Sequence, residues 1–146
     1  MADLPEFTLH RYFIWANRMR TLFDDVLQRK AAGQIDAGRF EIETFHYMSY
    51  WYSALFVVVE GWQELKLQDA RIDALLSDAS KLGLLRRYRN GVFHFQKKYF
   101  DDRFVDLISK DDGFVTWIRN LNQEIGRWFL EWFQIRRQAE KSAPTK

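Results

Sequence analysis

The chain has 146 residues, a length that suits one domain built around one hydrophobic core. Hydrophobic residues make up 47% of it, which is too many for a disordered protein. It contains no cysteine, and this excludes disulfides and cysteine-ligated metals or clusters. The net charge is only +2, so any affinity for nucleic acid must come from basic residues that cluster locally.

The sequence carries no pattern that targets a membrane. No basic start followed by an apolar stretch is present, so we expect no signal peptide. The longest apolar run, residues 54–59, is too short to span a bilayer and ends at Glu60. We therefore expect a cytoplasmic protein that does not enter the membrane.

The first half of the chain predicts two long helices. Apolar residues recur at helical spacing over residues 6–30 and again over residues 39–65, on either side of a loop over residues 31–38. The second helix is apolar around most of its circumference, so we expect it to be central. Its β-branched run at residues 57–59 resembles a strand, but helix-period residues flank it on both sides and favour a helix.

The second half predicts shorter helices and then one long helix. The segments span residues 70–77, 79–97, 99–109 and 113–140, and the third of these is a short helix or a turn. Asp69 is expected to cap the first segment, and Asp111 and Asp112 to precede the last one. The sequence therefore predicts an all-α bundle of about five helices over residues 1–141, with a disordered tail at residues 142–146.

The last helix has the most regular pattern in the chain. Its apolar residues alternate spacings of four and three: Phe114, Ile118, Leu121, Ile125, Trp128, Trp132 and Ile135. Core packing is the simplest interpretation of this stripe. Its C-terminal half is also a candidate dimer interface, formed by Trp128, Phe129, Trp132 and Phe133. The two interpretations are compatible, because one side of the stripe can face the core and the other side a second subunit.

One short stretch concentrates reactive chemistry. Within six residues it holds Arg89, Asn90 and His94. On a helix that continues through His94, the side chains of Asn90 and His94 would lie on one face. Cleavage of RNA by its own 2′-hydroxyl needs a group that exchanges protons near neutral pH, which suits His94. It also needs a cation on the phosphate, which suits Arg89, and a group that orients the others, which suits Asn90.

Neighbouring residues extend this candidate site. Four basic residues could track a phosphate backbone, although a solvated helix face is the simpler interpretation: Arg86, Arg87, Lys97 and Lys98. Glu60 interrupts the apolar central helix, and a buried carboxylate requires a partner. We expect Glu60 to pair with an arginine of the motif helix, either Arg89 or Arg86. Such a pair would position the arginine and also partly neutralise it.

The motif and the helix order resemble the HEPN family of helical domains. That family carries an arginine followed by four to six residues and then a histidine, which here corresponds to Arg89 and His94 with four residues between them. Asn90 directly after the arginine is common in the family. The resemblance also covers the order of two long helices, a short one, the motif helix and a closing helix.

The resemblance implies a homodimer in which both motifs line one cleft. Active members are metal-independent endoribonucleases that leave a cyclic phosphate, many of them in toxin–antitoxin, defence or mobile-element loci beside an antitoxin or a nucleotidyltransferase partner. Other members bind RNA or nucleotides without cutting, or act only as scaffolds. Because His94 stands between two phenylalanines, catalysis, RNA binding and a structural role all remain open.

No cofactor is expected from the sequence. His10 and His46 lack the spacing of metal ligands, and no glycine loop of the phosphate-binding kind is present.

Overall fold

The computed structural model describes residues 4–109 and 113–144, and it confirms the all-α class. The described residues form six helices and no strand: α1 (Pro5–Ala31), α2 (Ala37–Glu64), α3 (Ala70–Leu76), α4 (Ala79–Phe93), α5 (Asp102–Ser109) and α6 (Phe114–Ser142). Six helices replace the expected five because the segment before α6 is a helix, α5, rather than a turn.

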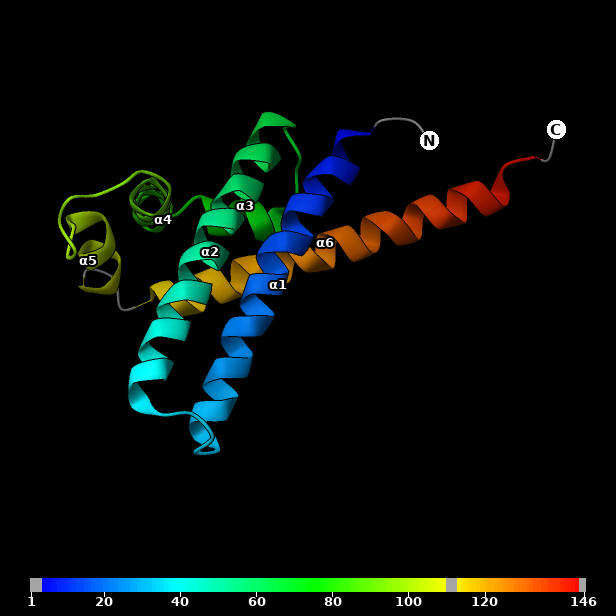
Figure 1. Cartoon of the computed structure of the whole chain (residues 1–146). Helices are drawn as coiled ribbons and strands as arrows, with labels where there is room; N and C mark the ends of the chain where they lie inside the picture. The colour runs from blue at the N-terminus through cyan, green and yellow to red at the C-terminus, as the bar shows by residue number, and fades with distance from the viewer. Residues whose placement is uncertain (1–3, 110–112, 145–146) are drawn as a thin grey trace.

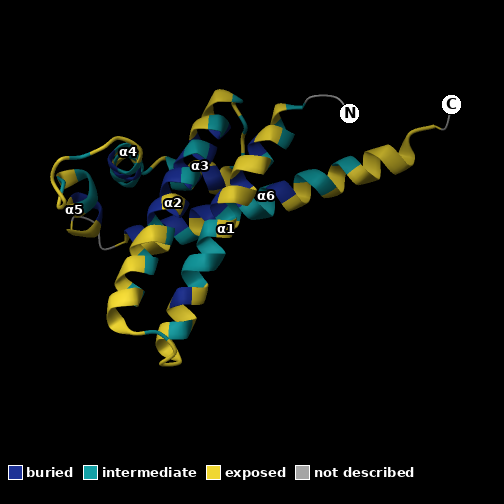
Figure 2. Ribbon diagram, viewed as in Figure 1, coloured by how far each residue is buried: buried dark blue, intermediate teal, exposed yellow. Residues whose placement is uncertain are grey.

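The helices are arranged around an antiparallel hairpin of α1 and α2. Helix α6 runs across this hairpin, and its second half extends beyond α1 (Figure 1). Helix α4 crosses α2 on the side away from α1, with α5 packed against α4. Buried residues gather where these helices cross (Figure 2).

Helix α2 occupies the central position that its sequence predicts. It carries more buried residues than any other helix, including Trp51, Leu55 and Trp62. The β-branched run is helical, and Val58 and Val59 are fully buried. Burial on several sides of α2 therefore outweighs the modest helix penalty of β-branched residues.

Aspartate side chains cap the N-termini of three helices. Asp69 accepts hydrogen bonds from the backbone N–H groups of Arg71 and Ile72, as predicted. Asp36 and Asp78 cap α2 and α4 in the same way. The predicted cap at Asp111 and Asp112 lies outside the described residues.

The motif helix ends four residues earlier than its sequence suggested. α4 stops at Phe93, and His94 has an extended backbone with φ −119° and ψ 126°. Beyond this point Phe95 is 93% exposed and Tyr99 86% exposed, so a further helical turn would have no partner to pack against. Without burial, one more turn does not offset the entropy lost in ordering it.

The last helix extends beyond the helices that cover it. α6 reaches Ser142, the first residue of the predicted disordered tail, and Ala143 and Pro144 follow it; residues 145–146 lie outside the described range. The apolar side of α6 is covered from Phe114 to Phe129. It is no longer covered at Ile135, which is 66% exposed. The reason is visible in Figure 1, where this end of α6 projects past α1. None of the described helices is both long and apolar enough to cross a membrane.

Candidate functional site

Arg89 is held in place by three contacts. Its Nε donates to Asn90 Oδ1 at 3.0 Å, and its Nη1 donates to Glu60 Oε2 at 3.1 Å. Its guanidinium also lies 4.7 Å from the ring centroid of Phe56. The predicted ion pair between Glu60 and the motif helix is therefore present, and α2 supplies two of the three contacts.

These contacts change the expected roles within the motif. The Glu60 side chain is 46% exposed rather than buried, whereas that of Arg89 is only 22% exposed. The side-chain oxygen of Asn90 orients Arg89. The backbone carbonyl of Asn90 accepts a hydrogen bond from the backbone N–H of His94 at 3.1 Å. Part of the charge of Arg89 is offset by a carboxylate that water can reach.

His94 lies in a different environment from Arg89. It is exposed at the end of α4 and lines a groove of about 740 Å³ between α2 and the segment that leads into α5. Aromatic residues surround it there, among them Phe95, Tyr99 and Phe100. Arg89 does not line this groove. The two motif residues share one end of α4 but do not meet in one cavity of the single chain.

The predicted basic residues divide into two groups. Arg87 forms an ion pair with Asp106 of α5, so much of its charge is offset. Arg86 is exposed and lies 5.8 Å from the Phe56 ring centroid. Lys97 and Lys98 are exposed beside His94, and Lys98 lines the same groove. Of these four basic residues, Lys98 is the one that lines the groove with His94.

Gly91 has a structural role that the sequence analysis missed. A Cβ at this position would lie 2.9 Å from Cε1 of Phe104 and 3.1 Å from Cβ of Arg103, both on α5. Only a residue without a side chain lets α5 approach α4 this closely. The motif therefore has a packing function as well as a polar one.

Tyr88 anchors the motif helix to α2. Its hydroxyl is hydrogen-bonded to Ser49 Oγ at 2.8 Å, and both residues are buried. Burial raises the pKa of Tyr88 to about 12, although the hydrogen bond to Ser49 acts in the opposite direction. The neutral phenol is thus the form that this site holds.

The aromatic end of α6 is covered mainly by α1 of the same chain. Phe129 is 1% exposed and stacks on Phe13 with ring centroids 5.6 Å apart, so α1 of the same chain already covers it. The rings of Trp132 and Phe133 both pack against Phe7, and the ring centroids of Trp128 and Trp62 lie 5.0 Å apart. Trp128, Trp132 and Phe133 are only partly buried, and their interface role stays a prediction.

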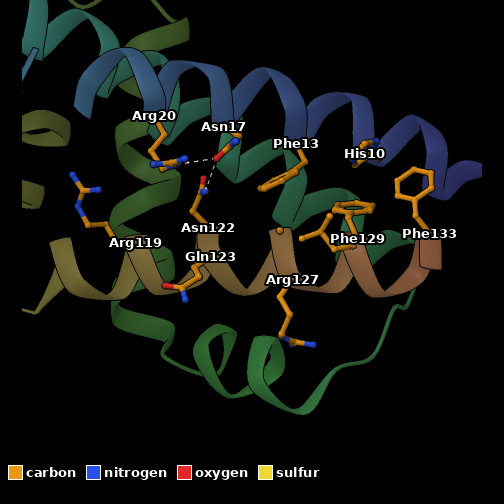
Figure 3. Close-up of a pocket in the computed structure, with 12 residues that line it drawn as sticks. His10, Phe13, Asn17, Arg20, Arg119, Asn122, Gln123, Arg127, Phe129 and Phe133 are labelled. Carbon is orange, nitrogen blue, oxygen red and sulfur yellow. Dashed lines mark hydrogen bonds between the residues drawn. The ribbon is translucent and has the colours of Figure 1, made fainter. Parts of the chain in front are cut away.

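A second cavity lies between α1 and α6, where the sequence predicted nothing. It has a volume of about 690 Å³ and is lined by polar residues at one end and aromatic residues at the other (Figure 3). Its two walls come from segments about a hundred residues apart, so no local pattern could reveal it. Among the described residues, no three His, Asp or Glu side chains gather closely enough to hold a metal ion.

Comparison of the chain with family models, with curated proteins and with solved structures finds no match.

Proposed function

We propose that this protein is a HEPN-like RNA-binding domain that acts as a metal-independent endoribonuclease, with its site at the end of α4. The observation that carries the proposal is the position of His94. It stands exposed in an open groove beside Lys97 and Lys98, one turn after the hydrogen-bonded pair Arg89 and Asn90.

The proposed reaction uses the 2′-hydroxyl of the RNA as the nucleophile. His94 carries out one of the two proton transfers, either accepting the proton of the attacking 2′-hydroxyl or donating one to the leaving 5′-oxygen, and water carries out the other. The new bond joins the 2′-oxygen to phosphorus as the bond to the 5′-oxygen breaks, which leaves a 2′,3′-cyclic phosphate. Arg89 binds the phosphate with its planar donor group and gives up Glu60 to do so.

A homodimer would complete the site. Arg89 and His94 do not line one groove in a single chain, and in a homodimer a second motif would supply the missing group. Large apolar residues are exposed on α2, at the end of α4 and in the segment that follows it: Ile42, Phe45, Tyr50, Phe93, Phe95 and Phe100. Phe45, Phe95 and Phe100 line the groove with His94, and Ile42 and Tyr50 line a neighbouring hollow that shares Phe45. Exposed apolar residues gathered in this way support a protein interface. We therefore propose dimerisation through this face, and an antitoxin or nucleotidyltransferase partner remains an expectation from the family resemblance.

The decisive experiment is RNA cleavage in the presence of a chelator. The unmodified protein should cut RNA and leave cyclic phosphate ends. His94→Ala should lower the rate by about a hundredfold or more, with the helical content and the oligomeric state unchanged. Arg137→Gln, at the exposed end of α6, removes a positive charge away from the motif and should cut RNA normally. If no RNA is cut, or if His94→Ala cuts at the original rate, the ribonuclease proposal is wrong.

Two observations favour a second function, a non-catalytic interaction or scaffold module. Glu60 offsets the charge of Arg89, and Gly91 packs α4 against α5, which is what a structural motif would require. On this proposal His94→Ala weakens self-association or partner binding and no RNA is cleaved. Sedimentation of the unmodified protein and of His94→Ala over a range of concentrations, together with the cleavage assay, separates the two functions.

A further inference from the structure

Helix α6 continues into solvent beyond its contacts with the rest of the chain. Trp132 and Phe133 still pack on α1, whereas residues 137–142 are helical but exposed. In Figure 1 this end of α6 projects past α1. A helical end that packs on nothing is only marginally stable in water, because its backbone hydrogen bonds barely offset the entropy lost in ordering it. A partner that covers this end would therefore stabilise it.

A second stripe of residues follows the outer side of α6, apart from the stripe that enters the core. Its members alternate spacings of four and three, the repeat with which two helices pack side by side. Five of them line the cavity between α1 and α6: Arg119, Gln123, Gly126, Leu130 and Phe133. Arg137 and Glu140 continue the same spacing on the projecting end. We call these seven residues the outer seam.

Leu130 stands at the centre of the outer seam. It is 68% exposed, although its position on α6 is flanked by the cavity on one side and by the projecting end on the other. An exposed leucine alone is common on protein surfaces. Here it lies in a groove of about 690 Å³ between two helices, which is a shape that accepts a third helix.

The outer seam is complementary to its own reverse. When two copies of α6 run antiparallel about a two-fold axis at Leu130, residues nearly equally far from Leu130 face each other. Arg119 then faces Glu140 of the second copy, so opposite charges meet. Gly126, which has no side chain, faces Phe133, and the two Leu130 side chains meet at the axis. A parallel pair would instead place Arg119 opposite Arg119, which is repulsive.

The end of the cavity that would receive Glu140 carries positive charge. Arg20 and Arg119 both bind Asp24, at 2.8 Å and 2.7 Å, so two guanidinium groups share one carboxylate. Figure 3 shows both arginines at this end of the cavity. Glu140 is exposed and makes no ion pair with any of the described residues. The two ends of the outer seam therefore carry unbalanced charges of opposite sign.

Hydrogen bonds hold this end of the cavity in shape and leave donors free. The indole nitrogen of Trp51 donates to Asn122 Oδ1 at 3.0 Å, so the amide nitrogen of Asn122 points to Asn17 Oδ1, also at 3.0 Å. Arg20 Nε donates to the same oxygen of Asn17 at 2.9 Å. The two hydrogens on Asn17 Nδ2 have no acceptor among the described residues. A carboxylate that enters here finds fixed donors as well as charge.

We propose that two copies of this chain associate through the outer seam, with their α6 helices antiparallel. The projecting end of each copy then lies along the cavity of the other. Leu130 and Phe133 contribute most of the affinity, while Arg119 and Glu140 set the direction, because exposed charges add specificity more than stability. The outer seam shares no residue with the groove beside His94, so this association neither uses that groove nor depends on RNA cleavage.

Sedimentation of two matched variants of the full chain tests the surface. Leu130→Glu places a charge at the centre of the outer seam and should weaken self-association by about tenfold or more. Ile135→Glu is the control, since Ile135 is 66% exposed on the same helix but lies about 140° away from Leu130 around its axis. It should associate as the unmodified protein does. Equal association of the two variants, or an unmodified protein that stays monomeric at high micromolar concentration, would overturn the proposal.

Cross-linking tests the direction and register, and it is specific for this surface. The chain has no cysteine, so Gln123→Cys and Arg137→Cys, both at exposed positions, each provide a single thiol. A mixture of the two variants should form a disulfide-linked pair on mild oxidation, because residue 123 of one copy faces residue 137 of the other. Each variant alone should not, since two copies of one of these residues would lie roughly 20 Å apart along the helix axis.

The remaining outcomes count against the proposal. If either variant links efficiently to itself, α6 pairs in another register or in parallel, and the two-fold arrangement is wrong. If the mixture gives no linked pair, the outer seam does not bind a second copy. Any ribonuclease activity should be the same for Leu130→Glu and the unmodified protein, so a failure here leaves the proposal for His94 untouched.

Discussion

Arg89 shows how one neighbouring residue sets the role of a functional side chain. Its guanidinium has five donors, of which Glu60 and Asn90 engage some and the ring of Phe56 covers one face. The carboxylate of Glu60 both orients the arginine and competes with any phosphate for it. Since Glu60 is nearly half exposed, water weakens the ion pair and a polyanion could displace it.

We predict that Glu60→Gln raises the affinity for RNA by roughly two- to fivefold, because it removes the competing charge and keeps the shape of the side chain. The free energy of unfolding should change by less than about 1 kcal/mol, as expected for an exposed ion pair. Fluorescence anisotropy with a labelled RNA and thermal unfolding measure the two effects.

Glu64→Gln is the matched control, since Glu64 lies one turn further along α2 and is exposed. It should leave RNA affinity nearly unchanged. If both substitutions raise affinity equally, only net charge matters. If Glu60→Gln weakens binding, the carboxylate acts by positioning Arg89.

At the scale of the element, the two glycines of α4 have different surroundings. A Cβ added at Gly83 would meet nothing within 4 Å, whereas one at Gly91 would collide with α5. The same residue type therefore has opposite consequences at two positions of one helix. At Gly83 glycine only lowers helix propensity, whereas at Gly91 it permits the close approach of α4 and α5.

We predict that Gly83→Ala stabilises the protein by about 0.5–1 kcal/mol, because alanine is the better helix former where space is free. Gly91→Ala should destabilise it by about 1–3 kcal/mol, because Phe104 must shift to admit the methyl group. Chemical unfolding of the two variants measures both values, and equal effects would contradict the packing of α4 on α5.

Helix α6 illustrates a periodic stripe that continues where its partners end. Ile125 and Ile135 belong to the same apolar repeat, yet Ile125 is fully buried and Ile135 is exposed. The repeat specifies which side of α6 is apolar. How far that side is covered depends on the length of α1 and on the angle at which the two helices cross.

Substitution of the two isoleucines should separate these contributions. Ile125→Ala is expected to cost about 2–5 kcal/mol, since it opens a cavity in a closed core. Ile135→Ala is expected to change the free energy of unfolding by less than about 0.5 kcal/mol. A large loss at Ile135, measured by urea unfolding at low protein concentration, would mean that the exposed end of α6 is covered in solution.

At the scale of the whole molecule, two buried tyrosines join the central hairpin to the motif helix. Tyr52 on α2 and Tyr88 on α4 have ring centroids 5.8 Å apart. Burial raises the pKa of Tyr52 to about 12, with Tyr88 adding to the rise and Arg119 opposing it. Burial likewise raises the pKa of Tyr88 to about 12. The folded state therefore holds both phenols in their neutral form.

This predicts a loss of stability at high pH. The unfolded chain releases these protons near pH 10, whereas the folded chain retains them to about pH 12. The stabilisation is complete below about pH 10 and is lost as the pH rises towards 12, by on the order of 2 kcal/mol for each tyrosine. Urea unfolding between these pH values measures the slope, and Tyr88→Phe should reduce it by about half. A slope that Tyr88→Phe leaves unchanged would contradict this origin.

Much of the architecture follows from the sequence by itself, because it depends on local interactions. The period of the apolar residues predicts the helices, the apolar circumference of α2 predicts its central place, and Asp69 predicts the start of α3. The clustering of Arg89, Asn90 and His94 is likewise a local property. Each of these requires only residues within a few turns of one another.

The tertiary structure decided the features that depend on how distant helices cross. It ended α4 at Phe93, because nothing lies beyond to pack on a further turn. It paired Glu60 with Arg89, and it buried Phe129 under α1. It also formed the cavity in which Asn17 and Asn122 meet. The physical reason is the same in each case: a side chain's partners across a helix crossing depend on the angle and length of both helices, which no local pattern contains.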